Sequence, residues 1–240
     1  MTLPSELRCG IFIDLEGTSS LFSENENRYL QALDSLLYSS TVIANHTTDN
    51  RLLLHQMGAD GLFIISDGPY RDYSKPLAVA IVLMQIVLLA GAVTKCGISF
   101  GNNGDYRSAL PRLEALLESG YIEPRAGGLM TKVNIMGTAL INSHRVASIE
   151  PRGGRLAVDS RLSHLIPSNI KVTKLGADMV IVDWIHNEIS EIDQLYSIAG
   201  IAQPGIEQLE NALKAYVKNT GSLGLGEWGE NTLQYADCLS

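Results

Sequence analysis

Two carboxylates in this chain stand where apolar segments turn sharply, and together they could bind a divalent metal. Asp14 ends an apolar run at 10–13 and precedes Leu15-Glu16-Gly17, which is the pattern of a strand that turns into a helix. Asp60 lies between apolar runs and is followed by glycine, and Asp-Gly in that setting predicts a hairpin tip. Carboxylates that end two neighbouring strands often hold Mg²⁺ or Mn²⁺ beside a polyphosphate. The sequence therefore predicts a metal site built on Asp14 and Asp60.

The bulk composition is that of a folded domain. At 240 residues, with 45% hydrophobic and 18% charged residues, the chain can bury a full core. Its net charge of -8 argues against nucleic acid as a partner, because phosphate backbones bind clustered Lys and Arg, but bound metal ions would still allow a nucleotide. Cys9, Cys96 and Cys238 form no CxxC pattern, and no secretory signal is evident, so we expect a cytoplasmic protein with buried thiols.

Apolar periodicity and turn residues predict an α+β or mixed α/β arrangement. The expected strands are 8–14, 51–57, 61–66, 95–100, 155–158, 170–174 and 178–184, and the expected helices are 20–45, 75–91, 108–118 and 137–149. Residues 101–105 are glycine-rich and polar, and we expect a loop there. The uncharged run 77–93 contains Gln85 and Gly91, and we interpret it as a helix buried under a sheet rather than a membrane span.

The last segment, 187–240, differs from the rest of the chain. Apolar residues recur in it at helical spacing, at Ile206, Leu209, Leu213 and Val217. It ends in glycine-rich and polar sequence. We therefore expect a first domain over 1–186 and a C-terminal helical appendage over 187–240, which packs on the domain or on a second subunit.

The segment Phe12-Ile13-Asp14-Leu15-Glu16-Gly17-Thr18 is compatible with several kinds of phosphate chemistry. It resembles the first motif of haloacid dehalogenase-type phosphatases, in which one carboxylate attacks phosphorus and a second, here Glu16, is the acid. It also resembles the D-x-E start of DEDD-type exonucleases, for which His186 and Asp193 would be the later pair. An acidic chain without a basic, aromatic groove disfavours a nuclease. A metal-dependent phosphohydrolase that uses Asp14 and Glu16 stays an alternative.

A third resemblance extends along most of the chain. The segment 134–146, NIMGTALINSHRV, resembles the D-x-x-G-x-x-V-N-x-A-x-R-M motif of class III nucleotidyl cyclases, and 95–101, KCGISFG, resembles their R-x-G-I-x-x-G strand. Together with Asp14 and Asp60, these motifs follow the family's order over residues 8–184. The resemblance implies a ferredoxin-like α+β fold, with a mixed sheet flanked by helices. It also implies a homodimer with its sites at the interface.

The same resemblance implies the reaction and its charged residues. Asp14 and Asp60, helped by the carbonyl of Leu15, would hold two Mn²⁺ or Mg²⁺ ions beside a nucleoside triphosphate. The ribose 3′-hydroxyl would attack the α-phosphorus, and pyrophosphate would leave. Arg145 would neutralise the transferring phosphate, or else lie on the surface of an amphipathic helix.

One position departs from the family pattern. Ile141 stands where the family has an asparagine one helical turn before the arginine. Asn142 could substitute for it, because residues three apart share a helix face with Arg145. The departure also leaves open a catalytically inactive, nucleotide-binding module.

Further residues are assigned to the substrate. Gly17, Thr18 and Ser19 open a helix, whose free N–H groups could bind the β- and γ-phosphates. Phe12 shares a strand face with Asp14, and it either lies against the nucleotide or packs in the core. Lys174 is a candidate phosphate contact.

Two amides suggest the base. The family reads purines through a Lys and Asp pair or a Glu and Cys pair, and those positions fall here on Gln56 and Asn134. Amides both donate and accept, which suits uracil or cytosine; the alternative for Gln56 is a solvent-facing side chain. In this respect the chain resembles the pyrimidine cyclases of bacterial Pycsar anti-phage systems. The implied reaction is cyclisation of UTP or CTP to a second messenger.

Overall fold

The computed structural model describes residues 6–46, 53–57, 60–65, 73–105, 135–150, 152–187, 189–220 and 226–237. The strands are β1 (Glu6–Leu15), β2 (Leu53–Met57), β3 (Gly61–Ile65), β4 (Thr94–Asp105), β5 (Ile135–Met136), β6 (Leu156–Asp159), β7 (Val172–Leu175) and β8 (Met179–Val182). The helices are α1 (Thr18–Glu24), α2 (Glu26–His46), α3 (Ser74–Leu89), α5 (Thr138–Ala147), the short 3₁₀ helix η2 (Ser160–Leu165), α6 (Ser190–Ala199), α7 (Ile206–Thr220) and α8 (Gly226–Asp237).

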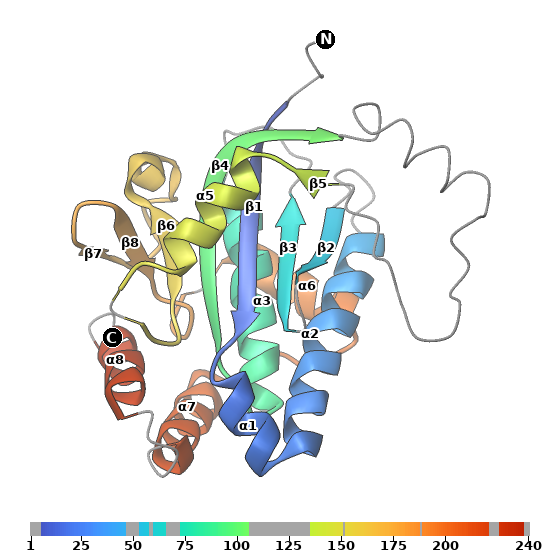
Figure 1. Ribbon diagram of the computed structural model, residues 1–240, viewed down its shortest axis with the longest axis vertical. Helices are drawn as coiled ribbons and strands as arrows, with labels where there is room; N and C mark the ends of the chain where they lie inside the picture. The colour runs from blue at the N-terminus through green and yellow to red at the C-terminus, as the bar shows by residue number, and fades with distance from the viewer. Residues whose placement is uncertain are drawn as a thin grey trace, which may run out of the picture.

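The described strands form a mixed sheet with helices on both faces. Their order is β2-β3-β1-β4-β6-β8-β7, and β5 pairs with the end of β4. The β4–β6 pair is parallel, whereas the other pairs are antiparallel. Helix α5 crosses one face of the sheet, and α3 and α6 lie behind the other (Figure 1). The expected α+β architecture is confirmed.

Strand β1 lies inside the sheet, and its side chains alternate between the two faces. Alternate residues of a strand point to opposite faces. Accordingly Ile11, Ile13 and Leu15 belong to the large buried cluster on the face that α3 covers, and Phe12 belongs to the small cluster beneath α5. Asp14 follows the same alternation, so it shares the α5 face with Phe12.

Helix α3 is buried on nearly every side, as the uncharged run predicts. Its buried polar residue is bonded at both ends of the amide: Gln85 Nε2 donates to the carbonyl of Trp184 at 2.7 Å, and Gln85 Oε1 accepts from the Tyr196 hydroxyl at 2.8 Å. Both bonds tie α3 to the C-terminal part of the chain. Within the described part of the chain, no helix is long and apolar enough to cross a membrane.

The C-terminal helices pack on the same core. Leu195 of α6, Leu209 and Leu213 of α7 and Trp228 of α8 all join the large buried cluster that contains β1 and α3. The expected helical spacing in this segment is therefore confirmed. A domain boundary between 186 and 187 stays a prediction.

The helix expected over 20–45 is wrong as a single element. The chain forms α1 and α2, which are separated at Asn25. The Asn25 side chain accepts a hydrogen bond from the backbone N–H of Arg28 at 3.1 Å. Asparagine competes for backbone donors in this way, which favours helix ends over helix interiors.

The loop expected at 101–105 is also wrong. Strand β4 continues to Asp105, where it pairs with β5, and Gly101, Asn102 and Asn103 pair with the first residues of β1. Glycine and asparagine are typical of loops, but here two neighbouring strands supply backbone partners. The sheet overrides the local preference.

Helix α5 approaches β4 closely because glycines face it. A Cβ atom on Gly97 would overlap the carbonyl oxygen of Ser143 and lie 2.6 Å from the backbone nitrogen of Ala147. A Cβ atom on Gly101 would overlap the backbone of Ala139. Both glycines belong to the 95–101 segment, so its spacing has a physical reason.

Gly97→Ala should therefore force α5 away from the sheet. Overpacking of this kind costs about 1–3 kcal/mol of unfolding free energy. Denaturant unfolding measures it. Gly205→Ala is the control for the added methyl, because nothing lies within 4 Å of its Cβ; it should show only the smaller cost of replacing the glycine that caps α7. A Gly97→Ala protein as stable as the parent would contradict the close packing of α5.

Candidate active site at the end of strand β1

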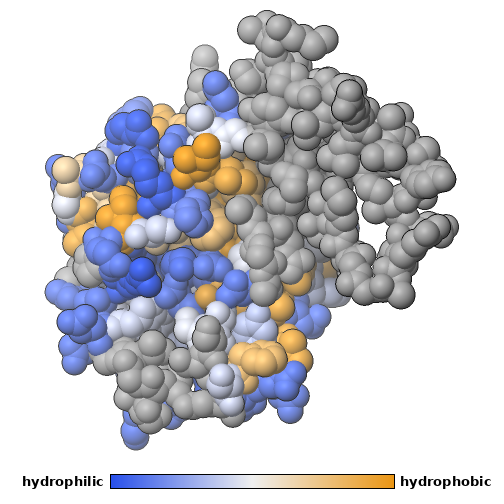
Figure 2. Space-filling model, viewed as in Figure 1, coloured by the Kyte–Doolittle hydropathy of each residue, from blue (hydrophilic) through white to orange (hydrophobic). Residues whose placement is uncertain are grey.

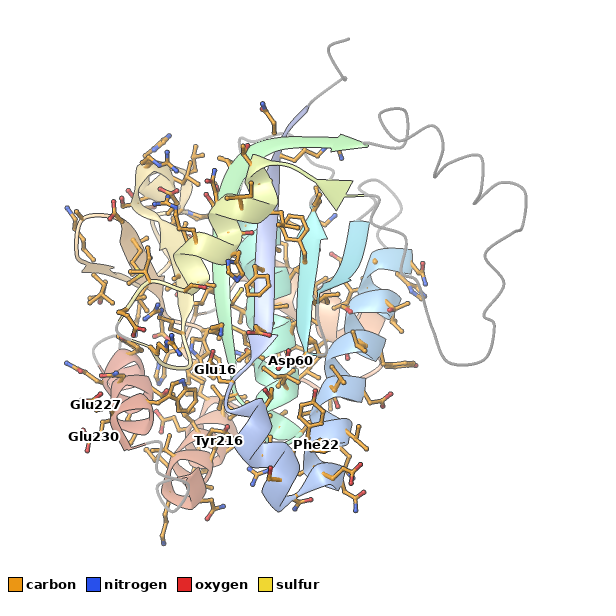
Figure 3. The ribbon with its side chains drawn as sticks, viewed as in Figure 1. Glu16, Phe22, Asp60, Tyr216, Glu227 and Glu230 are labelled. Carbon is orange, nitrogen blue, oxygen red and sulfur yellow. The ribbon has the colours of Figure 1, made fainter. Side chains whose placement is uncertain are left out.

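Asp14 and Asp60 lie side by side. Asp14 pairs in register with Gly61, the first residue of β3, and the Leu15 N–H donates to the Asp60 carbonyl at 3.3 Å. Strands β2 and β3 are antiparallel with Met57 opposite Gly61, so the predicted hairpin is confirmed. Figure 3 shows Asp60 and Glu16 at the end of the sheet where β1 leads into α1. The two acids that the sequence pairs are therefore neighbours in space.

A lysine lies between two acids of this site. Lys95 stands opposite Asp14 in the β1–β4 ladder. Its Nζ is 3.0 Å from Asp14 Oδ2 and 2.6 Å from Glu16 Oε1. The sequence analysis did not assign Lys95 to the site. Its place opposite Asp14 depends on strand register, which becomes visible only once β1 and β4 are paired.

The third acid, Glu16, is buried and held from the far end of the chain. The Trp228 indole Nε1 on α8 donates to Glu16 Oε2 at 2.8 Å. Only 8% of Glu16 and 9% of Trp228 is exposed. The Glu16 N–H also donates to the Val93 carbonyl at 2.9 Å. Trp228 was missed as well, because no local pattern connects it to the start of the chain.

The site carries more negative than positive charge. Burial raises the pKa of Asp14, and the charges of Asp60 and Glu16 raise this pKa further. The hydrogen bond and charge of Lys95 lower it, but they offset only part of the rise. Burial lowers the pKa of Lys95, but its bonds to Glu16 and Asp14 outweigh burial, so the pKa is raised overall. Burial raises the pKa of Tyr29 too, and the charges of Asp60 and Asp14 add to the effect. A further cation would relieve this excess of negative charge.

These residues fit a hard divalent cation with few protein ligands. Carboxylate oxygens of Asp14 and Asp60 and the Leu15 carbonyl are the donors that Mg²⁺ and Mn²⁺ prefer. Across the described ranges, no group of three or more His, Cys, Asp or Glu is arranged to hold a metal. Mg²⁺ commonly binds through one or two carboxylates, with substrate phosphates and water as its other ligands. The donor set therefore suits a metal that arrives with a polyphosphate.

Among comparisons with known proteins, only solved structures match this chain, and they identify its fold. No protein-family model matches the chain, and no curated protein matches it significantly. The adenylyl cyclase CyaB from P. aeruginosa has a TM-score of 0.52 at 13% identity, over 76% of this chain and 96% of CyaB. The chain has the class III nucleotidyl cyclase fold. A bacterial light-regulated adenylyl cyclase is less similar, with a TM-score of 0.49 at 10% identity over 87% of this chain and 59% of that chain. The dimeric guanylyl cyclase domain of the RhoGC fusion protein from Blastocladiella emersonii has a TM-score of 0.46 at 9% identity over 75% of this chain and 97% of that domain.

In this cyclase fold, the other predicted residues of β1 and α1 lie close to Asp14. Phe12 is 4% exposed beneath α5, and its ring meets the His144 ring edge-on at 4.8 Å. Leu15 packs its side chain in the core. Gly17 adopts φ +68° as the N-cap of α1, which begins at Thr18. The side chain of Ser19, the next residue, lies outside the described part.

Helix α5 carries the predicted Arg145 and Asn142, and each already has a partner within the chain. Arg145 Nη2 lies 3.7 Å from Asp159 Oδ2. Asn142 Nδ2 donates to the Phe100 carbonyl at 2.8 Å. Ile141 is 60% exposed, and Figure 2 shows hydrophobic side chains at the surface over α5.

Two predicted charged residues lie far from Asp14 within one chain. Asp159, the partner of Arg145, bonds Ser99, which is four residues beyond Lys95 on β4, or about 13 Å along the strand. Lys174 is on the edge strand β7, four inter-strand steps from β1, or about 19 Å. One chain therefore does not bring these cations to the acids.

The two residues assigned to the base are not tested. Gln56 lies on β2, but its side chain is outside the described residues, as is the whole of Asn134. Their role stays a prediction.

Asp14→Asn should make the metal-free protein more stable at pH 7. The folded-state pKa of Asp14 is raised above 3.8, its ordinary value. Its charging therefore costs stability as pH rises through the folded pKa, and at low pH the cost is absent. Asparagine removes that cost, and each kcal/mol removed should raise the melting temperature at pH 7 by about 2–4 °C.

The advantage of Asp14→Asn should fade as pH falls toward 4. Thermal unfolding with EDTA at both pH values measures it, and Asp34→Asn, at an exposed position on α2, is the control. A variant that is less stable than the parent at pH 7 would contradict the excess of negative charge.

Proposed function

We propose that the chain is a metal-dependent nucleotidyl cyclase. It would convert a nucleoside triphosphate to a 3′,5′-cyclic nucleotide and pyrophosphate. The observation that carries the proposal is that Asp14 and Asp60 lie side by side at the end of β1, in a chain with the class III cyclase fold. The raised pKa of Asp14 supports it, because the site favours an added cation.

The acids and the turn after β1 would bind the triphosphate. Asp14, Asp60 and the Leu15 carbonyl would hold two Mn²⁺ or Mg²⁺ ions, which supply charge neutralisation and a lowered pKa of the ribose 3′-hydroxyl when bound. The backbone N–H groups of Gly17, Thr18 and Ser19 would bind the β- and γ-phosphates. Lys95 would balance Asp14 and Glu16.

We propose that the complete site forms in a homodimer. Arg145 and Lys174 lie too far from Asp14 in one chain to touch the same triphosphate. A second copy of the chain would bring Arg145 to the α-phosphate, where a guanidinium stabilises the charge that develops during transfer. Asn142 would join Arg145 from the same α5, and Lys174 would contact phosphate.

The base is proposed to be uracil or cytosine, read by Gln56 and Asn134. Phe12 would pack on the base only if its ring left the cluster beneath α5. The buried position of Phe12 favours its core role. A cyclic pyrimidine nucleotide would act as a second messenger, and the likeness to anti-phage cyclases suggests defence as its setting.

A second candidate is a nucleotide-binding module without turnover. The Asn142 amide is bonded to the Phe100 carbonyl, and Arg145 is paired with Asp159. Either residue must leave its partner to reach a substrate. This module would bind a triphosphate and release no product.

Incubation of the protein with ATP, GTP, CTP or UTP and Mn²⁺ should give a 3′,5′-cyclic product from UTP or CTP, measured by mass spectrometry. Asp60→Ala should lower the rate at least about 100-fold, because it removes an acid that holds the metal. The matched control is Asp178→Ala, an exposed acid in the turn of the β7–β8 hairpin, which should keep the parental rate.

The same assay separates the alternatives. Cyclic product from ATP or GTP alone would overturn the base assignment but keep the cyclase. Triphosphate binding with no product from any nucleotide would favour the inactive module.

Glu16→Gln distinguishes the cyclase from a phosphohydrolase. Glu16 is engaged by Lys95 and Trp228, so we assign it no proton transfer. The variant should still form cyclic product at saturating Mn²⁺. Inorganic phosphate release by the parent, abolished by Glu16→Gln, would instead identify Glu16 as the acid of a phosphohydrolase.

A further inference from the structure

The C-terminal helix α8 reaches the acidic site through one side chain. The Trp228 indole meets Glu16, whereas Glu227 and Glu230 are exposed and point away from Glu16 (Figure 3). The Trp228 ring also packs edge-on against Tyr216 of α7, with centroids 6.0 Å apart. The tryptophan is thus held on one side by α7 and bonded on the other to an acid beside Asp14.

Helix α8 is seated firmly on the segment before β6. The Gly154 N–H donates to Thr232 Oγ1 at 2.7 Å, and Asn231 Nδ2 donates to the Arg152 carbonyl at 2.9 Å. A Cβ atom on Gly153 would lie 2.8 Å from the Tyr235 ring. The absence of a side chain there lets α8 approach. These contacts fix where Trp228 points.

The same helix is linked to the end of α5. The buried Arg155 donates to the carbonyls of Ala147 and Ile149 and to the Tyr235 hydroxyl, the last at 3.4 Å. Its guanidinium also lies 5.7 Å from the centre of the Tyr235 ring. Helix α8 therefore touches Glu16, just after β1, and, through Arg155, the helix that carries Arg145.

A chain of bonds connects Trp228 to Asp14. Trp228 donates to Glu16 Oε2, Glu16 Oε1 pairs with Lys95 at 2.6 Å, and Lys95 pairs with Asp14 at 3.0 Å. Glu16 and Asp14 thus compete for one ammonium group, which is closer to Glu16. The indole N–H fixes the carboxylate so that Oε1 faces Lys95. Glu16 therefore takes a share of Lys95 that Asp14 would otherwise have alone.

We propose that Trp228 is a positioning residue for the metal site. By holding Glu16, it keeps Lys95 shared between Glu16 and Asp14, so that Asp14 is only partly neutralised and can exchange Lys95 for a divalent cation. The inference rests on the proposed function in assigning a metal to Asp14 and Asp60. It makes the C-terminal helix part of the catalytic unit.

Trp228→Phe tests this role, because it removes the indole N–H and keeps an aromatic ring. Mn²⁺ binding, measured by the electron paramagnetic resonance signal of free Mn²⁺, should weaken about ten- to a hundredfold, as expected for a lost hydrogen bond to a charged group. In the assay for cyclic product, the Mn²⁺ concentration for half-maximal rate should rise by the same factor. Most of the rate should return at saturating Mn²⁺, because the cation then displaces Lys95.

Asn231→Ala is the matched control, since it removes a hydrogen bond that seats the same helix and touches neither Trp228 nor Glu16. It should lower the melting temperature and leave Mn²⁺ affinity unchanged. Trp228→Phe in a Glu16→Gln background should cause no further loss of affinity, because the bond chain is already broken. If Trp228→Phe does not fold, Glu16→Gln alone must weaken Mn²⁺ binding.

The outcomes separate this inference from the proposed function. Unchanged Mn²⁺ affinity in Trp228→Phe, or an equal loss in Asn231→Ala, overturns the positioning role and leaves the cyclase. Weakened binding in a protein that makes no cyclic product supports the positioning role and overturns the cyclase. A parent protein that binds no Mn²⁺ overturns both.

Discussion

The crowding of negative charge at the end of β1 is the constraint on which this site depends. Asp14, Glu16 and Asp60 lie together, and Lys95 is shared between two of them. Carboxylates brought together out of water raise one another's pKa unless cations compensate. The protein compensates with Lys95 and with the Trp228 indole, but burial still raises the pKa of Asp14, and Asp60 and Glu16 add to the rise. A divalent metal bound at this end of the sheet would offset the cost of keeping these carboxylates charged.

The sheet determines which groups share the site within one chain. Pairing of β1 with both β3 and β4 puts Asp60 and Lys95 beside Asp14. Two glycines of β4 let α5 lie close on the same face, but Arg145 on that helix is drawn to Asp159 rather than to the acids. The chain therefore holds Arg145 apart from the acids. In the proposed homodimer, Arg145 of a second copy would complete the site.

The sequence predicts those parts of the site that have a local signature. Asp14 after an apolar run and Asp60 before glycine were recognisable because a strand end and a hairpin tip each have one. Lys95 and Trp228 were not recognisable, because strand register and the docking of α8 join residues that are distant in sequence. The same limit applies to 101–105, whose loop-like residues are held in β4 by β1 and β5. Asn25 differs, since its capping role was local and available in the sequence, where an asparagine in a long helix signals a break.

Anomalous diffraction from crystals grown with Mn²⁺ and a non-cyclisable triphosphate analogue tests the central claim most directly. The account predicts Mn²⁺ peaks within ligand distance of the Asp14 and Asp60 carboxylates, with the analogue's phosphates against the turn at Gly17. Phosphates bound elsewhere, or an Asp14 that still pairs with Lys95 and has no Mn²⁺ beside it, would contradict the assignment of Asp14 and Asp60 as a metal site.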